Sequence, residues 1–201
     1  MLLSLHLALQ ALGFSDVEDS ELVELYLVSR GDRYFGELYR RYSPKVYGKC
    51  ITMLNNEAEA ADAVQDIFEK VLLRIGSFRR DSKFGTWLFT ITNNYCIDLL
   101  RKRKRLRKKV GDMPETDIED VVEETDWLQE QSPSAIRYIL ENLSELDRVA
   151  LVLMYMYELS VKEIAVQMGL QESATKMRLK RARQRAKKIY EDWSLNQNAY
   201  A

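Results

Sequence analysis

Basic side chains gather in two stretches of the chain, and the chemistry that they offer is the binding of phosphate. Residues 101–109 contain eight Lys or Arg and no acid, and residues 176–188 contain eight more, again without an acid. These two runs hold 16 of the 30 Lys and Arg, although the net charge of the chain is only −1. One or two cations at a helix end would merely suit the helix dipole. Charge concentrated to this degree indicates contact with a polyanion such as nucleic acid.

The same sequence offers little for catalysis or for metal binding. His6 is the only histidine, and the two cysteines, Cys50 and Cys96, lie far apart. This composition argues against most metal-dependent and histidine-based chemistry, against a zinc site and against a disulfide framework. A glycine-rich phosphate loop and a nucleophile motif are also missing. We therefore expect no catalytic residue, no metal and no cofactor, and a reducing, cytoplasmic compartment.

The elements that carry these charges are predicted to be helices. Apolar residues recur every three or four positions in each patterned stretch, and no stretch sustains the alternation typical of strands. We expect an all-α fold of two small helical domains, the second a helix-turn-helix domain, joined by a flexible acidic linker. The expected parts are an N-terminal extension (1–17), a first domain (18–110), the linker (111–133), a second domain (134–193) and a tail (194–201).

The two ends of the first domain differ in character. Residues 1–14 are apolar but too short to span a bilayer, so we expect no membrane insertion. Residues 111–133 contain nine Asp or Glu, two prolines and no Lys or Arg, and they lack hydrophobic periodicity. This composition is typical of a solvated linker.

The first basic run continues a helix predicted over residues 84–105. An apolar stripe at the start of this helix indicates that this end is buried. The stripe consists of Trp87, Leu88, Ile91, Tyr95 and Leu99. A basic loop with a glycine at each end and phenylalanines within it, residues 76–85, precedes the helix. A helix buried at one end and charged at the other would present its cations rigidly to phosphates.

A helix predicted over residues 57–75 carries acidic and amide side chains along one side. We call this set the polar ridge: Asp62, Gln65, Asp66 and Glu69, at positions i, i+3, i+4 and i+7. The opposite face of the helix is apolar. Two interpretations remain open, namely plain solvated surface, which is the default for a charged face, and a surface that binds a partner.

The second basic run lies in a predicted helix-turn-helix. Ser160 and Glu163 have the spacing of a capping box at the start of a short helix. Ala165 is small enough to let a second helix approach closely, and Gly169 suits the turn. The long second helix, from about residue 172, is expected to bury Thr175, Leu179, Ala182, Ala186 and Ile189 and to turn its cations outward. An ordinary helical hairpin is the alternative.

Together, residues 18–192 resemble the extracytoplasmic-function (ECF) sigma factors of bacterial RNA polymerase. The matching residues of the first domain are Ala60, Asp62, Gln65, Phe68, Phe78, Trp87, Leu88, Ile91, Asn94, Asp98 and Arg101. Those of the second domain are Leu143, Leu153, Ser160, Glu163, Ile164, Ala165, Gly169, Lys176, Arg178, Leu179, Arg181 and Ala182. Matches in both domains, in order and around a linker, are far more specific than either set alone. The chain departs from the family at Ala61, where an acid is usual, and at Thr175, which stands at a normally apolar core position.

The resemblance implies an alternative sigma factor that binds core RNA polymerase, recognises −10 and −35 promoter elements and assists promoter melting. The residues implied in binding the beta-prime clamp helices of the polymerase are Asp62, Gln65, Asp66, Phe68 and Glu69. Those implied for −10 DNA are Arg79, Arg80, Lys83, Phe84, Asn93, Asn94, Asp98, Arg101, Lys102, Arg103, Lys104 and Arg105. Those implied for −35 DNA are Glu172, Ser173, Thr175, Lys176, Arg178, Lys180, Arg181 and Arg183. The polymerase beta flap and an anti-sigma factor are further implied partners.

Some of these residues carry a more specific expectation. Phe84 is the aromatic residue expected to stack on an extruded −10 base, whereas Trp87, on the apolar stripe, is expected in the core. Lys176 and Arg178 are expected to read guanine in the major groove, with later arginines on the DNA backbone. The acidic linker is expected to thread a basic channel of the polymerase.

Two other functions remain as alternatives. A free-standing helix-turn-helix transcription regulator would explain the second basic run but not the first. An RNA-binding adaptor would use the aromatic and basic stretch of residues 84–105. Neither accounts for the order of both motif sets, and an enzyme is the least supported function because the sequence shows no catalytic site.

Overall fold

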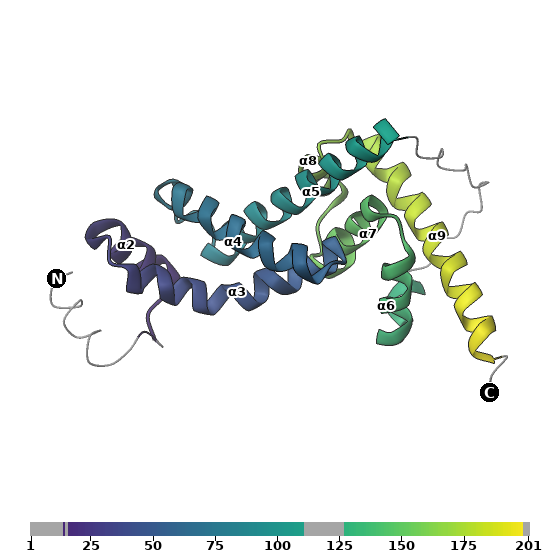
Figure 1. The fold of residues 1–201 in the computed structure, drawn as a ribbon, viewed down its shortest axis with the longest axis horizontal. Coiled ribbons are helices and arrows are strands. Elements are labelled where there is room, and N and C mark those ends of the chain that lie inside the picture. Colours follow the sequence, from purple (N-terminus) through teal and green to yellow (C-terminus); the bar gives the residue numbers. More distant parts are fainter. Residues whose placement is uncertain (1–13, 15, 111–126, 199–201) are drawn as a thin grey trace. The chain divides into compact units, whose positions relative to one another are not determined.

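The computed structural model describes residue 14, residues 16–110 and residues 127–198, and it builds them almost entirely from helices (Figure 1). No strand occurs in these ranges, which confirms the all-α expectation for them. The described residues form two compact units, one drawn from residues up to 51 and from 56–95, the other from 52–55 and from residue 96 onward. Most of the expected N-terminal extension (1–13 and 15), most of the expected linker (111–126) and the end of the expected tail (199–201) lie outside the described residues.

The first unit consists of four helices and a short turn. They are α2 (Asp19–Ser29), α3 (Asp32–Leu54), α4 (Glu57–Arg74), the 3₁₀ helix η1 (Ile75–Ser77) and the first part of α5 (Phe84–Val110). Arg30 ends α2 in the left-handed region, with φ of 53°. Asn56 begins α4, where its side chain accepts a hydrogen bond from the backbone N–H of Glu59 at 3.1 Å. These local signals explain why the predicted helix boundaries of this unit agree closely with the structure.

Each of these helices contributes one apolar face to the core of the first unit. Leu22 of α2, Leu38 of α3, Ile67 of α4 and Leu88 of α5 have no solvent exposure. Side chains that recur with the helical period lie on one face, so burying that face leaves the opposite face to solvent. This pattern is what exposes the polar ridge on α4. Within the described ranges, no helix is both long enough and apolar enough to cross a membrane.

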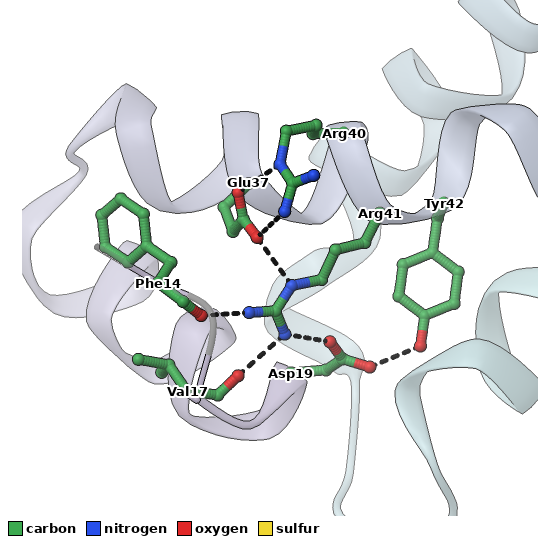
Figure 2. A network of polar contacts seen from close by, with 7 residues as sticks. All are labelled: Phe14, Val17, Asp19, Glu37, Arg40, Arg41 and Tyr42. Carbon is green, nitrogen blue, oxygen red and sulfur yellow. Dashed lines mark hydrogen bonds and ion pairs between the residues drawn. The ribbon is translucent and has the colours of Figure 1, made fainter. Parts of the chain in front are cut away.

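Arg41 of α3 fixes the chain that leads into α2 (Figure 2). Its guanidinium donates hydrogen bonds to the carbonyl oxygen of Val17 at 2.8 Å, to the carboxylate of Asp19 at 2.9 Å and to the carbonyl oxygen of Phe14. Its Nε also donates to the carboxylate of Glu37 at 2.8 Å. A single half-buried guanidinium therefore organises the entry to the first helix of the unit.

The charges around Arg41 are set by their neighbours. Hydrogen bonds from Arg40 and then Arg41 lower the pKa of Glu37 to about 2. Tyr42 donates its hydroxyl hydrogen to Asp19, and burial, followed by this bond, raises the pKa of Tyr42 above its usual value. Near neutral pH, Glu37 is therefore ionised and Tyr42 is neutral, which is the combination that the network requires.

The second unit contains the rest of α5 and the helices that follow the undescribed segment. These are η2 (Trp127–Glu130), α6 (Pro133–Asn142), α7 (Glu145–Leu151), the π-helical turn η3 (Val152–Met156), α8 (Val161–Met168) and α9 (Glu172–Asn198). The side chains of Ser132, Ser144 and Ser160 cap α6, α7 and α8 by accepting a backbone N–H three residues on. Gly169 ends α8 with φ of 54°, a conformation that costs little only for glycine.

The predicted helix-turn-helix is present as α8, the turn at Gly169 and α9. Ser160 and Glu163 form the predicted capping box. Ala165 of α8 is 3% exposed, and Leu179 and Ala182 of α9 are 2% and 0% exposed, so the small residue lies in the core as expected. The apolar faces of both helices are thus buried within one unit, as a helix-turn-helix requires.

The second unit begins earlier than the sequence suggests. Trp127 and Leu128 fall inside the predicted linker, yet the Trp127 ring lies 5.6 Å from the Tyr190 ring of α9, centroid to centroid. Leu128 is 7% exposed. Two apolar side chains in an acidic segment are unusual for a spacer, and here they are part of a folded unit.

Candidate nucleic-acid and polymerase interface

The polar ridge of α4 faces solvent, as its spacing predicts. All four members of the ridge, Asp62, Gln65, Asp66 and Glu69, are exposed, whereas the opposite face of α4 is buried. Asp66 accepts a hydrogen bond from the hydroxyl of Tyr95 on α5, so one member of the ridge also holds two helices together. The remaining members present two carboxylates and one amide in a line along the helix.

Phe68 does not belong to this surface. It is 4% exposed, and its ring contacts Tyr39 at 4.6 Å and Phe35 at 6.2 Å between centroids. The implied contact of Phe68 with the polymerase is therefore corrected: Phe68 packs between α4 and the aromatic residues of α3. Phe68 follows the buried Val64 by four residues and precedes the buried Val71 by three, so it lies on the buried face of α4.

Two leucines that the sequence reasoning missed extend the ridge. Leu72 is 40% exposed and Leu73 is 79% exposed on α4. They follow Asp62, Gln65 and Glu69 by one to three turns, and so lie on the same side of the helix. Two adjacent leucines outside the apolar period of α4 were the available signal. The ridge thus combines an acidic part with an apolar end.

The loop that precedes α5 borders a pocket of about 650 Å³. Basic and aromatic side chains line it, together with the acids Glu18 and Asp19. Its lining residues include Lys45, Arg80, Lys83, Tyr42, Phe84 and Phe89. Arg80 also pairs with Glu24 at 2.5 Å, but both side chains are about half exposed, so this pair contributes little stability. Arg79 and Lys83 are exposed, as expected for phosphate contacts.

Phe84, which was expected to stack on a −10 base, is buried more deeply than Trp87. Trp87, expected in the core, packs 5.6 Å from Phe78 and 5.8 Å from Phe84 between ring centroids. Phe84 is 2% exposed, with edge-to-face contacts to Tyr42 at 5.4 Å and Phe78 at 5.6 Å, whereas Trp87 is half-buried. Gly85 explains the burial, because a Cβ there would lie 3.1 Å from the Tyr42 ring. The stacking role assigned to Phe84 is therefore corrected: its ring is part of the core and of the pocket wall.

The expected exposure is also wrong for one of the two asparagines on α5. Asn93 is 4% exposed, so it is corrected from a base contact to an interior residue, whereas Asn94 is exposed. Thr92 beside it is fully buried and donates its hydroxyl hydrogen to the carbonyl oxygen of Leu88 at 3.0 Å. Because its hydroxyl group has a local partner, Thr92 can lie on a buried face. The buried face of α5 therefore includes Thr92 and Asn93 in addition to apolar residues.

The first basic run is a continuation of α5 and not a loop. Asp98 pairs with Arg101 at 3.1 Å along the helix, and Lys102 and Arg105 are exposed. Residues 101–105 form five consecutive cationic positions, and successive positions differ by about 100° around the axis. Two of them are engaged inside the second unit: Arg103, 21% exposed, pairs with Glu145 at 2.8 Å, and Arg101 donates to the carbonyl oxygen of Met168. The exposed Lys102 and Arg105 suit phosphate groups and carry no pattern for reading bases.

Thr175 lies on the buried face of α9, as its spacing predicts, although the resemblance also implied a DNA contact for it. Thr175 is fully buried and donates its hydroxyl hydrogen to the carbonyl oxygen of Gln171 at 3.0 Å. Its DNA contact is therefore corrected. The bond within the helix also explains how a polar residue occupies a core position that is apolar in the family.

Arg178 is held by an acid inside its own unit. Its Nη1 lies 2.8 Å from Oδ1 of Asp147, and Arg185 donates to the other carboxylate oxygen of Asp147. Asp147 is 1% exposed, so its charge needs these partners. The base-reading role of Arg178 is corrected to that of an internal ion pair. Nothing local in the sequence connects Asp147 to an arginine 31 positions later.

Arg183 is likewise engaged inside the unit. Its Nε donates to the hydroxyl oxygen of Tyr155 at 2.8 Å, and its guanidinium lies 5.7 Å from the centre of that ring. Glu172, Ser173, Lys176 and Arg181 remain exposed, and Lys180 is half-buried. The outward face of α9 is therefore narrower than predicted, because Arg178 and Arg183 are engaged inside the unit.

Comparison with known proteins agrees with this division into a ridge, a loop with its basic helix, and a helix-turn-helix. Residues 38–106 match the model of Sigma-70 region 2, and residues 134–185 match that of Sigma-70, region 4. The chain is 30% identical over 184 residues to the ECF RNA polymerase sigma factor SigM of Mycobacterium tuberculosis, covering 89% of each protein. It is 29% identical over 175 residues to the ECF RNA polymerase sigma factor SigW of Bacillus subtilis, covering 82% of this chain and 94% of that one.

A solved structure supports the same fold. The sigma factor RpoE of Bartonella quintana, crystallised with the anti-sigma factor NepR, is similar with a TM-score of 0.52 at 24% identity, over 78% of this chain and 96% of that one. The two regions occur in the order that the sequence predicted, and both consist of helices. With a relative at this level of identity spanning almost the whole chain, the protein belongs to the extracytoplasmic-function sigma factors.

Proposed function

We propose that this chain is an alternative sigma factor that binds core RNA polymerase and directs initiation at a particular set of promoters. The observation that carries the proposal is the presence of both regions on one chain, each with its own basic DNA-facing helix. Two DNA-binding surfaces connected by a linker gain selectivity when a scaffold fixes their separation. The polymerase would be that scaffold. The protein would then act in the cytoplasm, as a binding factor and not as a catalyst.

The polar ridge of α4 is the proposed contact with the beta-prime clamp helices of the polymerase. Asp62, Gln65 and Glu69 would supply charge and hydrogen bonds, and Leu73 would supply apolar area at the end of the ridge. Interfaces commonly combine a small apolar centre with a polar surround. The second unit would contact the beta flap, which leaves the outward face of α9 for DNA.

The pocket beside the loop before α5 is the proposed site for a base of the −10 element. Its volume of about 650 Å³ lies in the range of ordinary ligand pockets and exceeds the needs of one base. Lys45, Arg80 and Lys83 in its lining would hold the flanking phosphates. Separating a base-pair step costs about 1.4 kcal/mol on average, and capture of the freed base offsets such a cost. The basic helix beyond it would then hold the open strand.

The helix-turn-helix is the proposed reader of the −35 element. The N-terminal part of α9 would enter the major groove, where Ser173 and Lys176 are exposed to meet base edges. Arg181 and Lys180 would contact phosphates. Arg178 and Arg183 act by holding α9 against α7 and η3.

Run-off transcription with core RNA polymerase over a promoter library tests the proposal. We expect transcripts only when this protein is added, and only from promoters that share one −10 and one −35 sequence. If the protein instead binds a single duplex site tightly without polymerase and leaves the choice of start site unchanged, the chain is a free-standing regulator and the proposal is wrong.

A further inference from the structure

Met177 occupies the middle of the outward face of α9. Thr175, Leu179 and Ala182 mark the buried face, each at most 2% exposed. At about 100° per residue, Met177 points about 200° away from Thr175 and thus nearly opposite that face. Met177 is 46% exposed. The residue that projects furthest from the core at the start of this helix is therefore apolar.

Polar and cationic side chains surround Met177. Ser173 lies one turn before it, and Lys176, Lys180 and Arg181 lie beside it or one turn after it. A single exposed apolar residue needs no explanation by itself. This one stands at the centre of a positive surface whose charge complements phosphate, on the helix of a helix-turn-helix that enters the major groove.

The major groove offers one kind of apolar group to such a residue. Each base pair presents hydrogen-bond donors and acceptors there, and thymine adds its 5-methyl group. Methionine is unbranched and flexible, so its side chain can adjust to a methyl group without a fixed backbone distance. We propose that Met177 contacts thymine 5-methyl groups in the −35 element and makes this sigma factor favour thymine at one or two positions. The inference rests on the proposed function, because it requires α9 to read −35 DNA.

The test compares thymidine with deoxyuridine, which differs only by the missing methyl group. The −35 sequence preferred by the holoenzyme is first selected from a library. Each thymidine in either strand is then replaced singly by deoxyuridine, and holoenzyme affinity is measured. At the contacted position we expect about a fourfold increase in Kd, the equivalent of ~0.8 kcal/mol for one buried methylene-sized group.

Substitution of Met177 shows whether this residue is the cause. M177A should weaken binding to thymidine DNA by a similar factor and should no longer distinguish thymidine from deoxyuridine, whereas M177L should keep much of the difference. Met156, a methionine in η3 that is 56% exposed, provides the matched control. M156A should keep the whole difference.

Two results would overturn the inference. Equal affinity of the wild-type holoenzyme for thymidine and deoxyuridine at every −35 position would do so, as would an unchanged difference in M177A. If −35 recognition persists under either result, the proposed function stands without this contact. If the holoenzyme shows no dependence on the −35 sequence at all, the inference and the proposed function fail together.

Discussion

Asp147 lies under α9 with 1% exposure, between the guanidinium groups of Arg178 and Arg185. A buried carboxylate is costly to leave unpaired, and its partners are correspondingly hard to replace. Arginines of a DNA-binding helix are commonly assigned to DNA from sequence alone. Here the burial of Asp147, a partner on another helix, decides the role of Arg178. Arg178 cannot contact bases and hold Asp147 at the same time.

Arg178→Ala should therefore act on stability first. We expect a loss of about 1–3 kcal/mol in the free energy of unfolding of the second unit, because Asp147 loses one of two cationic partners. Promoter affinity should fall alike for matched and altered −35 sequences. Lys176→Ala is the control, with unchanged stability and a sequence-dependent loss of affinity. Urea unfolding and holoenzyme binding measure both effects, and a stable Arg178→Ala protein with a selective −35 defect would contradict the prediction.

Glu37 gives the first unit a defined dependence on acid. Its pKa is about 2 in the folded chain, below the ordinary value of 4.5, so its contribution to stability is complete above pH 4.5 and is lost as the pH falls toward 2. Glu37→Gln should lower the free energy of unfolding by about 2 kcal/mol at neutral pH and by much less at pH 3. Urea titrations at both pH values measure this. The exposed Asp192→Asn should show no such difference, and an equal loss for Glu37→Gln at both pH values would refute the prediction.

At the scale of elements, the helices and the exposed face of α4 were predictable, whereas the buried face at the start of α5 was not. Local signals such as the Asn56 cap, the Ser160 capping box and Gly169 decide where helices begin and end. Which of Phe84 and Trp87 is buried depends on Tyr42, which approaches from α3 because Gly85 has no side chain. The sequence contains this glycine, but its role becomes evident only from the packing of α3 against α5.

The ridge of α4 predicts a defect in polymerase binding that leaves the fold intact. Asp62→Arg combined with Gln65→Ala changes two exposed side chains, so thermal unfolding should be unchanged while capture of core RNA polymerase falls at least tenfold, about 1.4 kcal/mol. Asp192→Arg in α9 makes the same change in charge on another exposed site and serves as control. Undiminished capture by the double variant would return the ridge to plain solvated surface.

At the scale of the whole molecule, the −10 surface of the first unit and the −35 surface of α9 act together only when something fixes their separation. The isolated protein should bind promoter duplex weakly and with little sequence preference, and the holoenzyme should bind specifically. Lys102→Ala with Arg105→Ala, at two exposed positions of the first basic run, should weaken holoenzyme binding alike for all sequences, and should reduce the slope of log affinity against log salt by roughly two. Salt titrations with matched and altered promoters measure this. Tight, specific binding by the isolated chain at moderate salt would instead favour a free-standing regulator.

The packing of Trp127 and Leu128 limits the length of chain that can connect the two sigma regions, residues 38–106 and 134–185. The acidic segment 111–133 has 23 residues, but Trp127 packs on α9, which leaves at most 16. At about 3.3 Å per residue the greatest span falls from about 75 Å to about 53 Å. That difference corresponds to roughly six base pairs at about 3.4 Å each. The contact of Trp127 with Tyr190 should therefore narrow the range of spacings between −10 and −35 elements that the holoenzyme accepts.

Release of this contact should broaden that range. Trp127→Ala with Leu128→Ser removes the apolar groups that hold η2, so promoters with longer spacers should gain run-off transcription relative to the optimal spacer. The measurement uses promoters whose spacer changes one base pair at a time, with the unfolding of the second unit followed in parallel. Glu130→Ala, an exposed change in the same short helix, should leave the spacer profile as it is. If the double variant keeps the wild-type profile while the second unit remains folded, the polymerase alone sets the spacing, and Trp127 serves only the core of its unit.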